Sequence, residues 1–183
     1  MSSLAVALVH RAYAEEPATR ALALALAADG HRVRVITGGR PGRRTDGGVS
    51  VLQVPSLPAA PLRLRKLGED LVHLPAAALA VRSGGFDIVH AFSPPDALAA
   101  PAGAPVVLTF GAPVRRDGLA DRRLRLAVLR RALARSSAVV ASSEAVEASL
   151  MRWLGIRAER LDGADAAGHV ALYRRLIAFR PAR

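Results

Sequence analysis

The chain has 183 residues, of which 51% are hydrophobic, so it is long and apolar enough for one domain with a sizeable core and is not disordered. It contains no cysteine, which excludes a disulfide framework, a cysteine-based zinc site and a cysteine nucleophile. The net charge of +11 indicates either a solvated arginine-rich surface or an anionic partner, such as nucleic acid, anionic lipid or an anionic substrate. Aromatic residues make up only 4% of the chain, which leaves few rings for base stacking and argues against nucleic acid.

The first elements alternate between strand and helix. Residues 4–9 (LAVALV) form an apolar run that is too short for a signal peptide and has no basic region before it, so we interpret it as a buried strand. The stretch PATRALALALAADGH, at residues 17–31, predicts a helix, because Pro17 lies at a first-turn position and Gly30 lies just past the end. Residues 32–37 (RVRVIT) alternate with a period of two and predict the second strand.

The next stretch is less regular. Residues 38–48 (GGRPGRRTDGG) have neither the Walker spacing nor the dinucleotide spacing of a phosphate loop, so we interpret them as a mobile basic loop. Residues 49–54 (VSVLQV) predict a strand. Residues 63–82 have a helical composition that Pro75 interrupts, which predicts a kink or two helices.

The second half continues the alternation. Strands are predicted at residues 87–91, 105–110 and 137–142, and helices at residues 119–135, 142–154 and 165–179. This order predicts an α/β fold: a single domain with a mostly parallel sheet and helices on both faces. Ligands of such sheets bind at the carboxyl ends of the strands, so the residues that follow each strand are the candidates for a site.

Several of these segments together resemble glycosyltransferase family 4. The matching stretches are ALALALAADGHRVRVIT, FDIVHAFSPPDALAA, APVVLTFGAP, SSAVVASSEAVEASLMRWLGI and ERLDGADAAGH, which occur in the family's order. The resemblance implies a Rossmann-like domain of the B-type glycosyltransferase fold at residues 1–164. It also implies that residues 165–183 form the helix that returns to pack on this domain, and that the donor-binding domain is missing.

The resemblance implies the acceptor-side half of a retaining, nucleotide-sugar-dependent glycosyltransferase that is inactive alone; any transfer would be of the hexosyltransferase class. The family's donor motifs have no counterpart here. Glu15 and Glu16 replace the glycine-rich loop after the first strand, where they would repel a phosphate. Phe110 stands where the family has a histidine. We therefore assign no catalytic residue and predict no metal and no organic cofactor.

The candidate ligand-binding residues follow strands or begin a helix. They are His10, Tyr13, His90, Ser93, Thr109, Gly111, Ser142, Ser143 and Glu144. His90 is interpreted either as a histidine satisfied by a neighbouring backbone group or as an acceptor contact. The stretch at residues 142–145 is interpreted either as a plain helix cap or as a small anion site. His31 is placed in a turn, and His73 and His169 at the surface or the edge of the core.

A second candidate is the basic stretch at residues 115–135. Its patch residues are Arg115, Arg116, Arg122, Arg123, Arg130 and Arg131. They form either a solvated helix or a surface for anionic membrane. The alternative functions are therefore a non-catalytic auxiliary module that oligomerises, or a basic peripheral membrane protein.

We predict a homo-oligomer or a partner protein over the exposed cleft face, with a nucleotide sugar or an acceptor as ligand. The predicted location is cytoplasmic, with or without peripheral attachment to a membrane.

Overall fold

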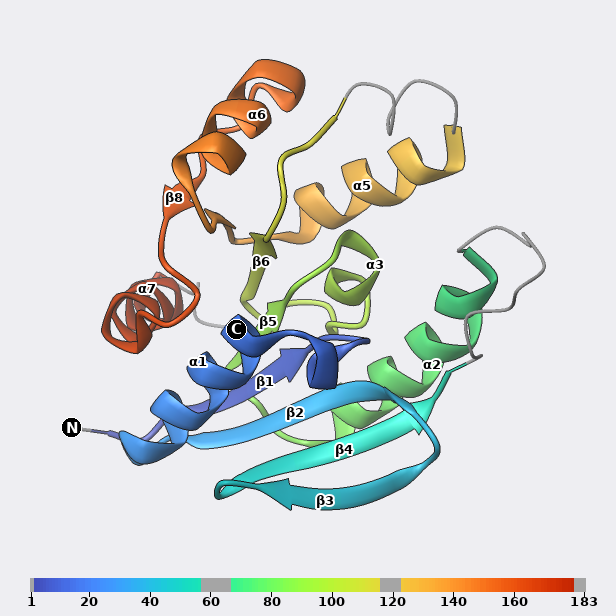
Figure 1. The fold of residues 1–183 in the computed structure, drawn as a ribbon, viewed down its shortest axis with the longest axis vertical. Helices are drawn as coiled ribbons and strands as arrows, with labels where there is room; N and C mark the ends of the chain where they lie inside the picture. Colours follow the sequence, from blue (N-terminus) through green and yellow to red (C-terminus); the bar gives the residue numbers. More distant parts are fainter. Residues whose placement is uncertain (1, 57–66, 116–122, 180–183) are drawn as a thin grey trace.

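The chain folds into one eight-stranded sheet with helices on both faces, as the computed structural model shows for residues 2–56, 67–115 and 123–179 (Figure 1). In chain order the elements are β1 (Ala5–Val9), the 3-10 helix η1 (Tyr13–Glu15), α1 (Pro17–Ala28), β2 (Arg32–Gly39), β3 (Gly42–Asp46), β4 (Val49–Pro55), α2 (Leu67–Ser83), β5 (Ile88–Ala91), α3 (Pro94–Ala97), β6 (Val106–Phe110), α5 (Arg123–Arg135), β7 (Ala138–Ala141), α6 (Glu144–Leu154), β8 (Glu159–Arg160) and α7 (Ala166–Ala178).

The strand order is β3-β4-β2-β1-β5-β6-β7-β8, and every neighbouring pair is parallel except β3 with β4. β1 lies in the middle, where Val6 is opposite Val33 of β2 on one side and Ile88 of β5 on the other. The predicted α/β class with a mostly parallel sheet is therefore confirmed.

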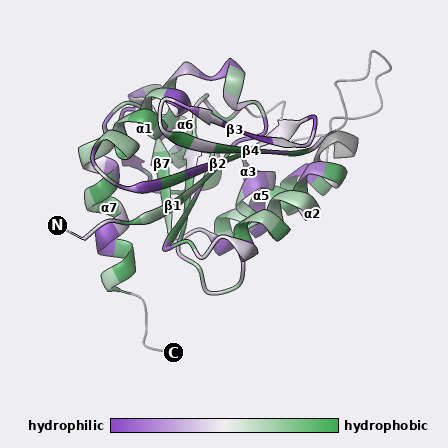
Figure 2. Cartoon of the chain, turned by 90° about the horizontal axis from the view of Figure 1, so that it is seen from below, coloured by the Kyte–Doolittle hydropathy of each residue, from purple (hydrophilic) through white to green (hydrophobic). Residues whose placement is uncertain are grey.

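The two faces of the sheet are covered by different helices. Side chains alternate along β1: Val6 and Leu8 pack in one cluster with α1 and α7, while Ala7 and Val9 pack in another with α2, α3 and α5. Figure 2 shows the sheet between these two layers. Because both faces are covered, the central strands consist of unbroken apolar runs. No helix in the described ranges is long and apolar enough to cross a membrane.

Local sequence explains where the helices begin and end. Pro17 opens α1 at its first position. Ser143 caps α6 by accepting a hydrogen bond from the Val146 amide at 3.3 Å, and Gly155 ends this helix with φ of 66°. α2 runs as a single helix across Pro75, so the two-helix alternative is wrong. Pro75 is exposed, and because it has no amide hydrogen the helix lacks one backbone hydrogen bond at this position.

The prediction of a mobile loop at residues 38–48 is also wrong. β2 continues to Gly39, and β3 pairs antiparallel with β4, with Asp46 opposite Val49. The two residues between them, Gly47 and Gly48, have φ of 53° and 88°, which is the requirement of a type I′ hairpin turn. The segment is therefore an exposed edge strand that is ordered by its turn.

Candidate functional site

The carboxyl ends of β1 and β5 form the natural place for a ligand. From β1 the chain builds outward to β2 on one side, and it later returns across the sheet to β5 on the other side. Ligands of open parallel sheets bind at such a change of direction, outside the carboxyl ends of the strands. His10 follows β1 here, and Phe92 and Ser93 follow β5.

His10 is the first side chain of this edge. Its backbone amide donates to the Ile36 carbonyl at 3.0 Å, which fixes its position, and its ring lies 5.4 Å from the Phe92 ring. Its Nδ1 atom is buried and has no hydrogen-bond partner. Burial lowers the pKa of His10, although the nearby Asp96 carboxylate opposes this effect. The ring as a whole is half-buried, and a neutral imidazole can accept a hydrogen bond at one of its two nitrogens.

Below this edge lies a polar cluster that consists of the buried His73 and Asp96 and the half-buried Ser93. The Ser93 hydroxyl donates to Asp96 Oδ2 at 2.7 Å and accepts from the Asp96 amide at 3.3 Å, which closes the first turn of α3. His73 Nε2 lies 3.4 Å from Asp96 Oδ1, and both side chains are 2% exposed. The His73 ring nitrogens form no hydrogen bond with any described residue. The prediction that His73 lies at the surface or core edge is wrong.

His90 and Thr109 belong to a second buried network, which holds α7 against the sheet. His90 Nδ1 lies 2.6 Å from the Tyr173 hydroxyl, and His90 Nε2 lies 2.7 Å from the Thr109 hydroxyl. The His90 ring also stacks on Phe92 at 4.4 Å and lies 5.3 Å from the His169 ring. Both ring nitrogens of His90 are therefore occupied within the protein.

Burial explains the charge state of this network. It lowers the pKa of His90 well below the ordinary range, and the neighbouring His169 adds to this effect. The pKa of His169 is lowered by the same cause, although its hydrogen bond from Nδ1 to the Asp165 carbonyl, at 2.7 Å, opposes it. His169 is 1% exposed, so its predicted place at the surface or core edge is wrong.

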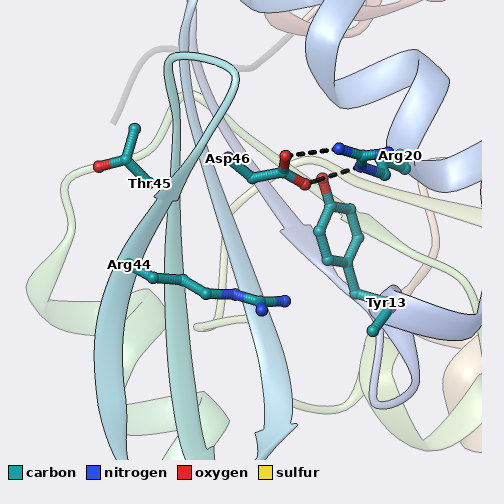
Figure 3. A pocket seen from close by; sticks show the side chains of 6 residues that line it. Tyr13, Arg20, Arg44, Thr45 and Asp46 are labelled. Atoms are coloured by element: carbon teal, nitrogen blue, oxygen red, sulfur yellow. Dashed lines mark hydrogen bonds and ion pairs between the residues drawn. The ribbon is translucent and has the colours of Figure 1, made fainter.

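Tyr13 points away from the carboxyl edge, beneath α1 (Figure 3). Its hydroxyl donates to Asp46 Oδ2 at 3.4 Å, and Arg20 forms an ion pair with the same carboxylate at 2.7 Å. These residues line a hollow of about 290 Å³, together with Ala14, Arg44 and Thr45. The arrangement anchors the β3–β4 hairpin to the first helix.

The remaining candidates lie farther along the same carboxyl edge. Gly111 follows β6 and is exposed. Ser142 follows β7 and is half-buried, Ser143 caps α6, and the exposed Glu144 lies 3.5 Å from Arg160. Beside them is a hollow of about 500 Å³, whose wall includes Glu144, Glu147, Met151, Ile156, Arg157 and Arg160.

The predicted basic patch is described only in part. Arg123, Arg130 and Arg131 are exposed on α5, and Arg115 is exposed before it. Arg116 and Arg122 lie outside the described residues. No group of histidine or acidic side chains suited to hold a metal ion occurs among the residues that the structure describes.

Comparison with solved structures shows the same fold. A shorter chain of sucrose-phosphate synthase from Thermosynechococcus elongatus is similar with a TM-score of 0.69 and 20% identity, over 93% of this chain and 98% of that chain. A longer chain of the same synthase matches with a TM-score of 0.64 and 17% identity, over 85% of this chain and 46% of that chain. HepE from Anabaena, in complex with UDP and glucose, matches with a TM-score of 0.56 and 17% identity, over 87% of this chain and 44% of that chain.

The chain thus spans less than half of the two longer structures. No curated protein matches the sequence. The family model of Glycosyltransferase Family 4 matches residues 16–162, which is most of the chain. The protein belongs to Glycosyltransferase Family 4.

Proposed function

We propose that this domain is the acceptor-side half of a glycosyltransferase and that a separate domain or chain supplies the donor site. Membership of the family supports this proposal, as does coverage of less than half of the longer structures. The observation that carries it is the half-buried imidazole of His10 at the change of direction between β1 and β5.

His10 would receive the acceptor hydroxyl. Its pKa is lowered by burial, so the imidazole is neutral at physiological pH and can accept a hydrogen bond or a proton. The nearby Asp96 carboxylate would stabilise the imidazolium that forms if the proton moves to His10. His90 and Thr109 would act by holding α7 in place and would not contact the acceptor.

The nucleotide diphosphate would be held by the other half. Glu15 and Glu16 are exposed just after the first strand, and no glycine in this turn allows close approach of a phosphate. Their negative charge repels a diphosphate. We therefore expect this domain to have little affinity of its own for a nucleotide sugar.

A partner would cover the carboxyl edge. Met151, which is 45% exposed, lines the hollow beside α6 and β8, and Trp153 of the same helix is 38% exposed. Exposed apolar side chains beside a hollow are typical of surfaces that a second chain covers. A homo-oligomer would meet this need, and light scattering after size exclusion would test it: a monomer at high protein concentration would contradict self-association.

Thermal shift measurements test the acceptor assignment. We expect stabilisation by at least one member of a panel of monosaccharides and sugar phosphates, because a ligand that binds only the folded state must stabilise it. His10→Ala should abolish the shift, and His31→Ala, which changes a half-buried histidine outside the carboxyl edge, should keep it. A shift with a nucleotide sugar alone that is unaffected by His10→Ala would refute the proposal.

A further inference from the structure

The outward surfaces of α2 and α5 form one side of the molecule. Both helices pack in the same cluster on the same face of the sheet, through Ala77, Ala80 and Ala132. Their exposed side chains therefore point in the same general direction, away from the sheet. Figure 2 shows the two helices on one side of the sheet, opposite α1 and α7. We call this surface the α2–α5 face.

The exposed residues of the α2–α5 face combine leucine with arginine. On α2 the exposed side chains in the described range are Val72, Pro75, Leu79, Arg82 and Ser83, and the first four recur every three or four residues as one stripe. On α5 the exposed side chains larger than alanine are Arg123, Leu124, Arg130 and Arg131. Leu79 and Leu124 are 71% and 60% exposed, and among the large apolar side chains of the described residues only Phe179 is more exposed.

The arginines of this face have no acidic partner among the residues that the structure describes. Residues 72–83 and 123–135 contain no aspartate or glutamate. The opposite side of the sheet differs: Arg20 of α1 pairs with Asp46, and Arg175 of α7 pairs with Glu159. The four arginines of the α2–α5 face make no ion pair with any described residue, so their charge is available to an external anion.

We propose that the α2–α5 face docks on a membrane surface that contains anionic lipid. Arginines at such a surface are attracted by the negative headgroups, and exposed leucines can enter the boundary between headgroups and acyl chains. Nucleic acid fits the face less well, because the only aromatic ring among residues 72–83 and 123–135 is that of His73, which is buried, and bases need exposed aromatic rings for stacking. The proposal uses residues away from His10 and does not depend on the proposed transfer reaction.

Vesicle flotation tests this proposal. The chain should float with vesicles of phosphatidylcholine and phosphatidylserine, should not float with phosphatidylcholine alone, and should be released by high salt. Arg130→Gln with Arg131→Gln should weaken binding roughly 25-fold, because each basic residue near the surface contributes about a fivefold change. Leu79→Ser with Leu124→Ser should also weaken it, because exposed leucines contribute buried apolar area.

A matched control distinguishes the contribution of the α2–α5 face to vesicle binding from the contribution of the overall positive charge. Arg43→Gln with Arg157→Gln removes the same charge from exposed positions outside the α2–α5 face, and this variant should bind vesicles nearly as well as the unchanged chain. Circular dichroism should show that all variants are folded. Equal weakening by the control pair would refute the proposal. So would the absence of binding to anionic vesicles, or binding to a DNA duplex that exceeds binding to vesicles and survives the leucine substitutions.

Discussion

Removal of the Tyr173 hydroxyl should destabilise the protein far more than its size suggests. Tyr173 is fully buried, and its hydroxyl is the partner of His90 Nδ1 at 2.6 Å. Tyr173→Phe keeps the ring but leaves this nitrogen buried without a partner, which costs about 1–3 kcal/mol. For a domain of this size, 1 kcal/mol corresponds to a change in Tm of roughly 2–4 °C. A decrease of about 2–12 °C is therefore expected.

The matched control is Tyr13→Phe. Tyr13 is equally buried, but its hydroxyl forms a long hydrogen bond of 3.4 Å with Asp46. Arg20 already donates to both oxygens of that carboxylate, at 2.8 and 2.7 Å, so the loss of the tyrosine hydroxyl leaves Asp46 paired. This substitution should cost at most about 1 kcal/mol.

Urea unfolding followed by far-UV circular dichroism gives both free energies of unfolding. The slope of the free energy against urea should stay constant, because neither substitution changes the surface exposed on unfolding. Thr109→Val should resemble Tyr173→Phe, since it leaves His90 Nε2 without its partner at 2.7 Å. If Tyr173→Phe were no more destabilising than Tyr13→Phe, the network would not hold α7 to the sheet as we describe.

Three further predictions concern stability. Burial lowers the pKa of His90 and His169, so below pH about 6.5 the unfolded chain binds more protons than the folded chain, and the free energy of unfolding decreases as the pH is lowered. The decrease should be roughly 1.4 kcal/mol per pH unit for each histidine that stays neutral in the folded state. Urea unfolding at several pH values should show this decrease, and constant stability between pH about 7 and 5 would contradict it. Ser143→Ala removes the cap of α6 and should cost about 1 kcal/mol, whereas an unchanged urea midpoint would mean that the cap contributes nothing. Leu150→Ala should cost about 2.7–5 kcal/mol, because Leu150 is fully buried; a loss below 1 kcal/mol in the same assay would show that its cluster is loosely packed.

The sequence was sufficient to predict the centre of the sheet but not its edge. Central strands are covered on both faces and therefore appear as apolar runs, as in β1 and β6. β3 was missed because its residues GRRTD are charged and exposed, and no apolar alternation marks it. The available signal was the turn: Asp46, Gly47 and Gly48 precede an alternating strand, which is typical of a hairpin.

The candidate site could be predicted where it depends on strand ends. His10 and Ser93 follow parallel strands, and topology places them at one edge. His73 and Asp96 come from different helices, and their burial depends on how these helices pack, which the sequence does not reveal. The burial of His169 had a detectable signal, because it lies four residues before Tyr173 and so shares its helix face.

The two borders of the sheet limit how copies of this domain can meet. β3 carries Arg43 and Arg44 along its exposed border, and β8, at the other end, is only two residues long. Both are poor templates for an incoming strand, because charge repels a second copy at one border and few free amides remain at the other. Any self-association must therefore use side chains and not a continuous intermolecular sheet, so strand-by-strand growth into fibrils is disfavoured despite the apolar centre.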